Sequence, residues 1–73
     1  MSSEGRLHPG QQLALQLGEG SELFCAEGRL AVTTSGTDGT PLTRVLCTGQ
    51  GWRAAQAAWV RLVAQRPSRY ILA

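Results

Sequence analysis

The stretch RLAVTTSGTDGTPLTRVLC, residues 29–47, decides the fold class of this 73-residue chain. Its first part, residues 29–34, is rich in β-branched side chains and places Leu30, Val32 and Thr34 on one face, which predicts a strand. Residues 35–41 form the strongest loop signal, in which Asp38-Gly39 suits the positive φ angles of a tight reversal. Residues 42–47 then return as a second strand. A hairpin at the centre of so short a chain predicts a mainly β domain.

Further short strands are predicted on both sides of this hairpin. Leucines alternate with other residues over 13–17, which is the period of a half-buried strand. Residues 22–26 form another strand between turns at 18–21 and 27–28, and residues 59–64 and 70–72 complete the set. The sequence therefore predicts a small antiparallel half barrel or sandwich of about six short strands.

Residues 52–65 leave two alternatives open. As a helix, this segment places apolar side chains on one face, and its five alanines favour helix. As β structure, it contains the strand pattern of 59–64 and continues the series of strands and turns that precedes it. We expect β structure over 52–64, because a lone helix would leave the small sheet with an unpaired edge. The alternative is an α+β domain with a helix at 52–65.

Length and composition limit the classes of protein. Residues 1–10 contain no apolar periodicity and predict a flexible leader, which leaves 11–73 as a single small β domain. A hydrophobic content of 42% excludes a disordered tail. No apolar run approaches the roughly 20 residues of a membrane span, and the first ten residues do not form a signal peptide. We therefore expect a cytoplasmic protein without a membrane partner.

The charges are unevenly distributed along the chain. Seven arginines and no lysine face five acids, and the balance is −3 over residues 1–39 but +5 over residues 40–73. Such asymmetry can mark a surface that binds anions or nucleic acid. The simpler interpretation, which we favour, is that acidic and basic strands are neighbours in the fold and neutralise each other locally.

No group of residues has the pattern of a catalytic or metal site. The only histidine, His8, lies in the predicted leader, where nothing could hold it against a nucleophile. Cys25 and Cys47 are 22 positions apart, and with one histidine they are too few for a zinc site. We expect both cysteines to be small buried apolar residues. The sequence therefore predicts a protein that is not an enzyme, with no catalytic residue, no metal and no cofactor.

Several short motifs resemble a known bacterial family. They are Leu13-x-Leu15-x-Leu17, the segment GRLAVT at 28–33, Gly36, Val45-Leu46-x-x-Gly49 and Val60-x-Leu62-x-Ala64. Over residues 11–65 they resemble the cupin-like domain of unknown function 2917, although Ala31 stands where that family tends to have Trp and Thr43-Arg44 replaces an expected acidic position. The resemblance implies a small cupin-like barrel or half jelly roll, favours strands in the last third, and implies no activity.

Two hypotheses about function follow. In the first, the domain is a non-catalytic oligomerising or protein-interaction module, because a chain this small buries only about 60% of its unfolded surface and gains from a partner. If Val60, Leu62 and Ala64 point into the core, the other face of that strand exposes an apolar patch, which predicts a homodimer interface. Its residues are Trp59, Arg61 and Val63. In the second, the arginine-rich C-terminal half is a small β-barrel surface for nucleic acid or another anion, with Arg44, Arg53, Arg61 and Arg69 as the binding residues.

Overall fold

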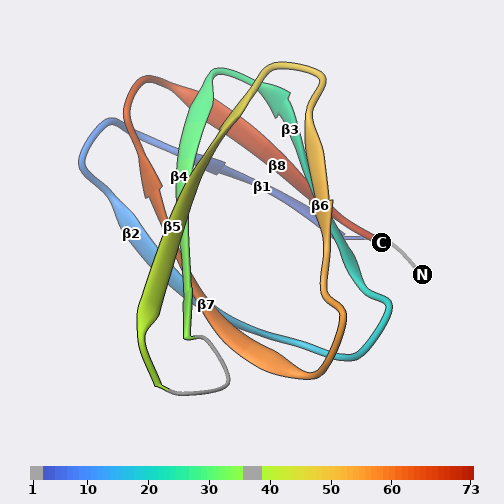
Figure 1. Cartoon of the computed structure of the whole chain (residues 1–73). Coiled ribbons are helices and arrows are strands. Elements are labelled where there is room, and N and C mark those ends of the chain that lie inside the picture. The colour runs from blue at the N-terminus through green and yellow to red at the C-terminus, as the bar shows by residue number, and fades with distance from the viewer. Residues whose placement is uncertain (1–2, 36–38) are drawn as a thin grey trace.

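Two four-stranded antiparallel sheets form the molecule (Figure 1). The computed structural model describes residues 3–35 and 39–73, and these contain eight strands and no helix. Sheet A consists, in spatial order, of β1 (Ser3–Leu7), β8 (Ser68–Leu72), β3 (Glu22–Glu27) and β6 (Gly51–Arg53). Sheet B consists of β2 (Gln12–Leu17), β7 (Ala58–Ala64), β4 (Arg29–Ser35) and β5 (Pro41–Cys47). The order is that of a jelly roll, and it confirms the predicted mainly β class with more strands than the expected six.

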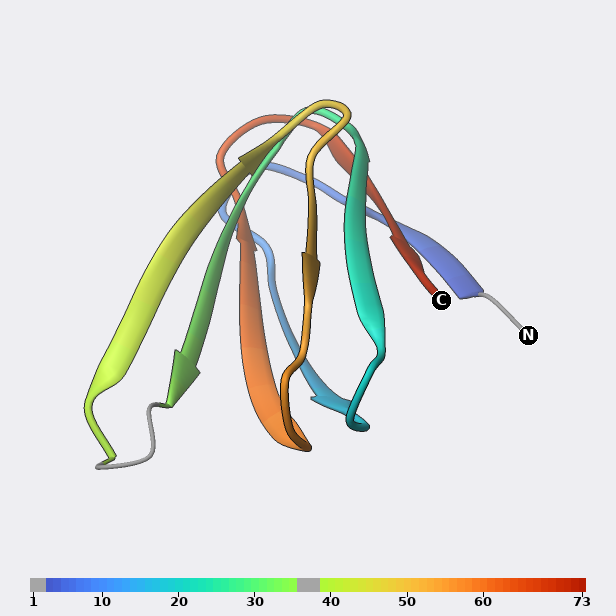
Figure 2. The same cartoon turned by 45° about the vertical axis from the view of Figure 1, so that its right-hand side comes forward.

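A single core lies between the two sheets. Each strand sends alternate side chains inward, as the pleat requires, and Figure 2 shows the two layers side by side. The side chains buried in this core come from both sheets; they are Leu7, Leu17, Leu23, Cys25, Leu30, Val32, Leu46, Ala54, Val60, Leu62 and Ala64. The alternation predicted for 13–17, 29–34 and 59–64 therefore describes how these segments face the core.

The alanine-rich segment is β structure, so the helix alternative for 52–65 is wrong. Residues 51–53 form β6 and residues 58–64 form β7, with a turn between them. β7 pairs with β2 on one side and with β4 on the other, and Ala54 exchanges backbone hydrogen bonds with the turn at 20–21. These tertiary contacts outweigh the helix propensity of the alanines. Among the described residues, no helix is long and apolar enough to cross a membrane.

The predicted flexible leader contains the first strand. β1 pairs with β8 along its whole length, from Ser3 opposite Leu72 to Leu7 opposite Ser68. Leu7 is buried in the core, and the ring of Tyr70 occupies the space that a side chain at Gly5 would need. The sequence prediction was wrong here because β1 has only one large apolar residue, so its own residues show no periodicity. β1 is ordered instead by its pairing with β8, which is distant in the chain. Glu4 and Arg69, for example, are in contact although they are 65 residues apart.

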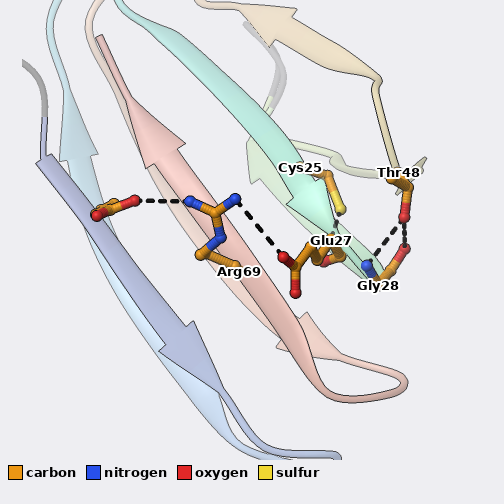
Figure 3. Close-up of polar contacts among 6 residues, drawn as sticks. Cys25, Glu27, Gly28, Thr48 and Arg69 are labelled. Carbon is orange, nitrogen blue, oxygen red and sulfur yellow. Dashed lines mark hydrogen bonds and ion pairs between the residues drawn. The ribbon is translucent and has the colours of Figure 1, made fainter.

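Three chain reversals are tied together at the top of Figure 1. Gly28 joins β3 to β4 with a φ of +89°, and a Cβ atom there would collide with the backbone of Pro67 and with Ser68. Its N–H donates to Thr48 Oγ1 over 3.0 Å, as Figure 3 shows, which links this corner to the turn after β5. Ser68 Oγ accepts from the Arg29 N–H over 3.0 Å and links it to the turn before β8. The close approach of these three turns thus depends on a glycine at this corner.

The turn between β4 and β5 follows the sequence prediction as far as it is described. Gly39 has a φ of +85°, which suits the tight reversal expected there. Asp38, the other half of the predicted Asp-Gly pair, lies outside the described residues.

Candidate interaction surface

The outer face of sheet B carries the exposed tryptophan. β7 is an inner strand of this sheet, and Val60, Leu62 and Ala64 point into the core with at most 2% of each residue exposed. Alternation then directs Trp59, Arg61 and Val63 outward. Trp59 is 64% exposed, although tryptophan is usually well buried. The strand orientation expected from the sequence is therefore the observed one.

An apolar row crosses this face at Val63. Val63 lies opposite Gln12 of β2 on one side and opposite Ala31 of β4 on the other. Ala31 in turn lies opposite Val45 of β5, which is 44% exposed. The row extends the patch around Trp59 to the edge of the sheet.

The neighbouring row is small and polar, and it forms a shallow hollow beside Trp59. Arg61 lies opposite Ala14 and Thr33, and the hydroxyl groups of Thr33 and Thr43 are hydrogen-bonded over 3.0 Å. Ala14 and Thr33 border, with Trp59, a depression of about 300 Å³. The face therefore combines one large aromatic side chain with an adjacent recess.

Arginines pair with glutamates on sheet A, whereas the strands of sheet B carry no acidic side chains. No strand of sheet B contains Asp or Glu. On sheet A, Arg69 of β8 lies 2.9 Å from Glu4 of β1 and 3.7 Å from Glu27 of β3 (Figure 3). At the edge of the same sheet, Arg53 lies 3.5 Å from Glu22. Acidic and basic strands are thus neighbours on sheet A, as the favoured interpretation of the charge pattern expects, whereas the arginines of sheet B have no acidic strand beside them.

The four arginines proposed for anion binding do not form one surface. Arg61 is on the outer face of sheet B, and Arg69 is held between glutamates on the outer face of sheet A. Arg44 and Arg53 do come together, since both line a hollow of about 460 Å³ beside Trp52. The guanidinium of Arg44 stacks over the Trp52 ring, 5.4 Å from its centroid.

The contact between Arg44 and Trp52 is not predicted from the sequence. One signal could have indicated it. Arg44 alternates with Leu42 and Leu46 along β5, so it lies on the inner face of sheet B and can meet a partner from sheet A, although the residue itself is exposed. The identity of that partner depends on how β5 and β6 meet, and this is a property of the folded chain.

The cysteines and the histidine lie in different environments. Both cysteines are free, and Cys25 is fully buried. Burial raises the pKa of the Cys25 thiol, and the neighbouring Cys47 adds to the effect, so Cys25 is held as an unreactive thiol. His8 is exposed after β1, where its backbone N–H donates to Gln11 Oε1. Within residues 3–35 and 39–73, no three His, Cys, Asp or Glu side chains are placed to hold a metal ion.

Solved structures resemble this fold closely, although no protein-family model and no curated protein matches the sequence. The crystal structure of Drosophila melanogaster CENP-C bound to CAL1 matches with a TM-score of 0.82 and 17% identity over 99% of this chain. The Drosophila melanogaster CENP-C cupin domain matches with a TM-score of 0.81, again at 17% identity over 99% of the chain. This chain spans 59% and 58% of those two chains. The likeness shows that the protein has a cupin-like fold.

Proposed function

We propose that the protein is a non-catalytic interaction module that forms a homodimer through the outer face of sheet B. The observation that carries this proposal is the exposure of Trp59, 64%, on a face whose strands contain no acidic residue. Aromatic and arginine side chains are enriched at the centres of protein interfaces, whereas acids are depleted there. Trp59 and Arg61 are two residues apart on β7 and point to the same side, so they supply both types at one place.

The apolar row enlarges the proposed interface beyond Trp59 and Arg61. Val63, Ala31 and Val45 lie in register across three strands, so a flat partner surface would cover them together with Trp59. A second copy offers such a surface, because a two-fold dimer joins the same patch on both subunits. The recess beside Trp59 also gives the indole of a second copy a place to insert. A small domain with a limited core gains stability from this burial.

The fold comparison supports an interaction module in a general way. One of the similar structures is CENP-C bound to another protein, CAL1, so a cupin-like domain of this kind can serve as a binding partner. Cytoplasmic location and membership of the domain of unknown function 2917 family remain predictions from the sequence.

Sedimentation measures the proposed assembly directly. The wild-type protein should sediment with twice the mass of one chain at micromolar concentration, and Trp59→Glu should sediment as a monomer. The matched control is Leu42→Glu, because Leu42 is also a large exposed apolar residue, 55% accessible, but lies on the other side of sheet B. A wild-type monomer at high micromolar concentration contradicts the proposal, as does equal dissociation of both variants.

The second hypothesis, nucleic-acid binding through Arg44, Arg53, Arg61 and Arg69, has less support. Arg69 is engaged by two glutamates on sheet A and Arg61 lies on the other sheet, so only Arg44 and Arg53 share one hollow. A strand of nucleic acid needs a continuous basic groove with aromatic platforms along it. Binding of a short random oligonucleotide that weakens steeply with salt would revive this hypothesis.

A further inference from the structure

A hollow between the two sheets is lined by both polar donor groups and apolar side chains. It measures about 460 Å³ and is lined by residues of β4, β5, β6, β7 and the turn between β6 and β7. Leu42, Ala55 and Ala58 supply apolar surface, and Thr34, Ser35 and Gln56 supply hydroxyl and amide groups. This volume falls within the range of small-molecule sites, about 300–1,000 Å³, and their usual lining is likewise apolar with a few polar groups.

Arg44 is the best-positioned charged group in this hollow. It lies opposite Val32, a core residue, and therefore projects from β5 toward the interior side of the sheet. Its guanidinium stacks over Trp52 at 5.4 Å from the ring centroid. Such a cation–π contact restrains the side chain while leaving the N–H groups of the guanidinium available. None of the ion pairs among the described residues involves Arg44.

Arg53 adds a second positive charge at the border of the same hollow. Its contact with Glu22 is long, 3.5 Å, and both side chains are well exposed, at 71% and 44%. Such a pair contributes little energy, so Arg53 can turn toward a bound anion at small cost. The wall of the hollow contains no acidic residue among the residues that the structure describes.

We propose that this hollow binds a small ligand that carries a carboxylate or a phosphate group on a compact apolar body. Arg44 holds the anionic group through two parallel N–H···O contacts, a geometry that the guanidinium fork favours. Leu42 and Ala58 pack against the apolar body. One face of Trp52 is already covered by Arg44, and a single hollow offers no path for successive bases, which favours a small ligand over a nucleic-acid strand. Thr34 and Ser35 border both this hollow and the recess beside Trp59, but Arg44, Arg53 and Trp52 line this hollow alone, so the two proposals rest on different residues.

Nuclear magnetic resonance of the 73-residue chain tests this site with two probes of similar size, benzoate and phenyl phosphate. Sodium chloride at equal ionic strength provides the baseline. Saturable shifts should appear at the Trp52 indole N–H, which Trp59→Phe distinguishes from the other tryptophan signal, and at Arg44 Nε. Stronger binding of one probe identifies the carboxylate or the phosphate as the preferred group.

Variants at two arginines separate the site from general attraction of anions. Arg44→Gln should weaken the better probe at least about tenfold, because it removes charge-assisted hydrogen bonds. Arg44→Lys keeps the charge without the fork and should bind with intermediate affinity. Arg61→Gln is the matched control and should bind as the wild type does, and so should the dimer-surface variant Trp59→Glu.

Three results would overturn the proposal. The first is the absence of saturable shifts with either probe, and the second is unchanged affinity in Arg44→Gln. The third is a Trp52 shift that appears only with an oligonucleotide, which would mean that the basic residues bind nucleic acid. A circular dichroism spectrum like that of the wild type shows that each variant is folded.

Discussion

The outer faces of the two sheets follow the same alternation of side chains but differ in the charged and apolar residues that they expose. On sheet A, Arg69 bridges two glutamates from its neighbouring strands, and Arg53 contacts Glu22. On sheet B, no strand contains an acid, and Trp59 is largely exposed. Charges that are paired within one face need no partner in water, whereas the face without acidic residues, which exposes Trp59 beside Arg61, is the one that we propose a partner covers.

Aromatic residues show the same contrast. Phe24 points outward from sheet A, but Gly51 lies opposite it on β6 and leaves room for the ring, which comes within 3.2 Å of the position of a glycine Cβ. Phe24 is therefore partly covered within the chain. Trp59 lies opposite Gln16 on β2, and no comparable packing covers it.

The largest effect should come from removing the interior anchor of β1, on which the outer face of sheet A depends. Leu7 is 4% exposed, so Leu7→Ala should lower the free energy of unfolding by about 2–4 kcal/mol, through lost burial and a residual cavity. Urea unfolding measures this change. Arg6→Ala alters the adjacent exposed position and should stay within about 0.5 kcal/mol of wild type. Equal, small effects of both would mean that residues 1–10 are a loose leader after all.

An intermediate effect is expected on the outer face of sheet B. Val45→Asp places a charge at the end of the apolar row and should raise the dimer dissociation constant about tenfold, which corresponds to about 1.4 kcal/mol. Sedimentation equilibrium measures the constant. Leu42→Asp changes the next exposed apolar residue of β5 on the opposite side and should leave dissociation unchanged. If Leu42→Asp dissociates the dimer and Val45→Asp does not, the interface lies on the other side of the sheet.

The smallest effect should come from the charges of sheet A. Arg69→Met removes both contacts to glutamates, whose side chains are 62% and 60% exposed, and should lower the free energy of unfolding by about 1 kcal/mol or less. Salt screens such pairs, so the difference from wild type should shrink in molar sodium chloride. The dimer dissociation constant should not change. A salt-independent loss would show that Arg69 acts through packing of its aliphatic part instead.

Period-two patterns in the sequence were sufficient for the central strands. The alternation over 13–17 and 59–64 identified which side chains enter the core, and the same alternation placed Trp59 outside before any tertiary contact was known. β1 could not be identified this way, because its pairing with β8 joins the two ends of the chain and its own residues carry no apolar pattern. β6 is only three residues long and depends on pairing with β3.

The sequence by itself determined the β class, the inward and outward sides of the main strands, and the split of charge between the two halves of the chain. These properties are local, since they follow from turn residues and from the order of side chains along each strand. Tertiary structure decided that Arg69 meets Glu4 and Glu27 and that Arg44 stacks on Trp52. Such contacts join strands that are distant in the chain, and their existence depends on sheet order and register, which no short segment specifies.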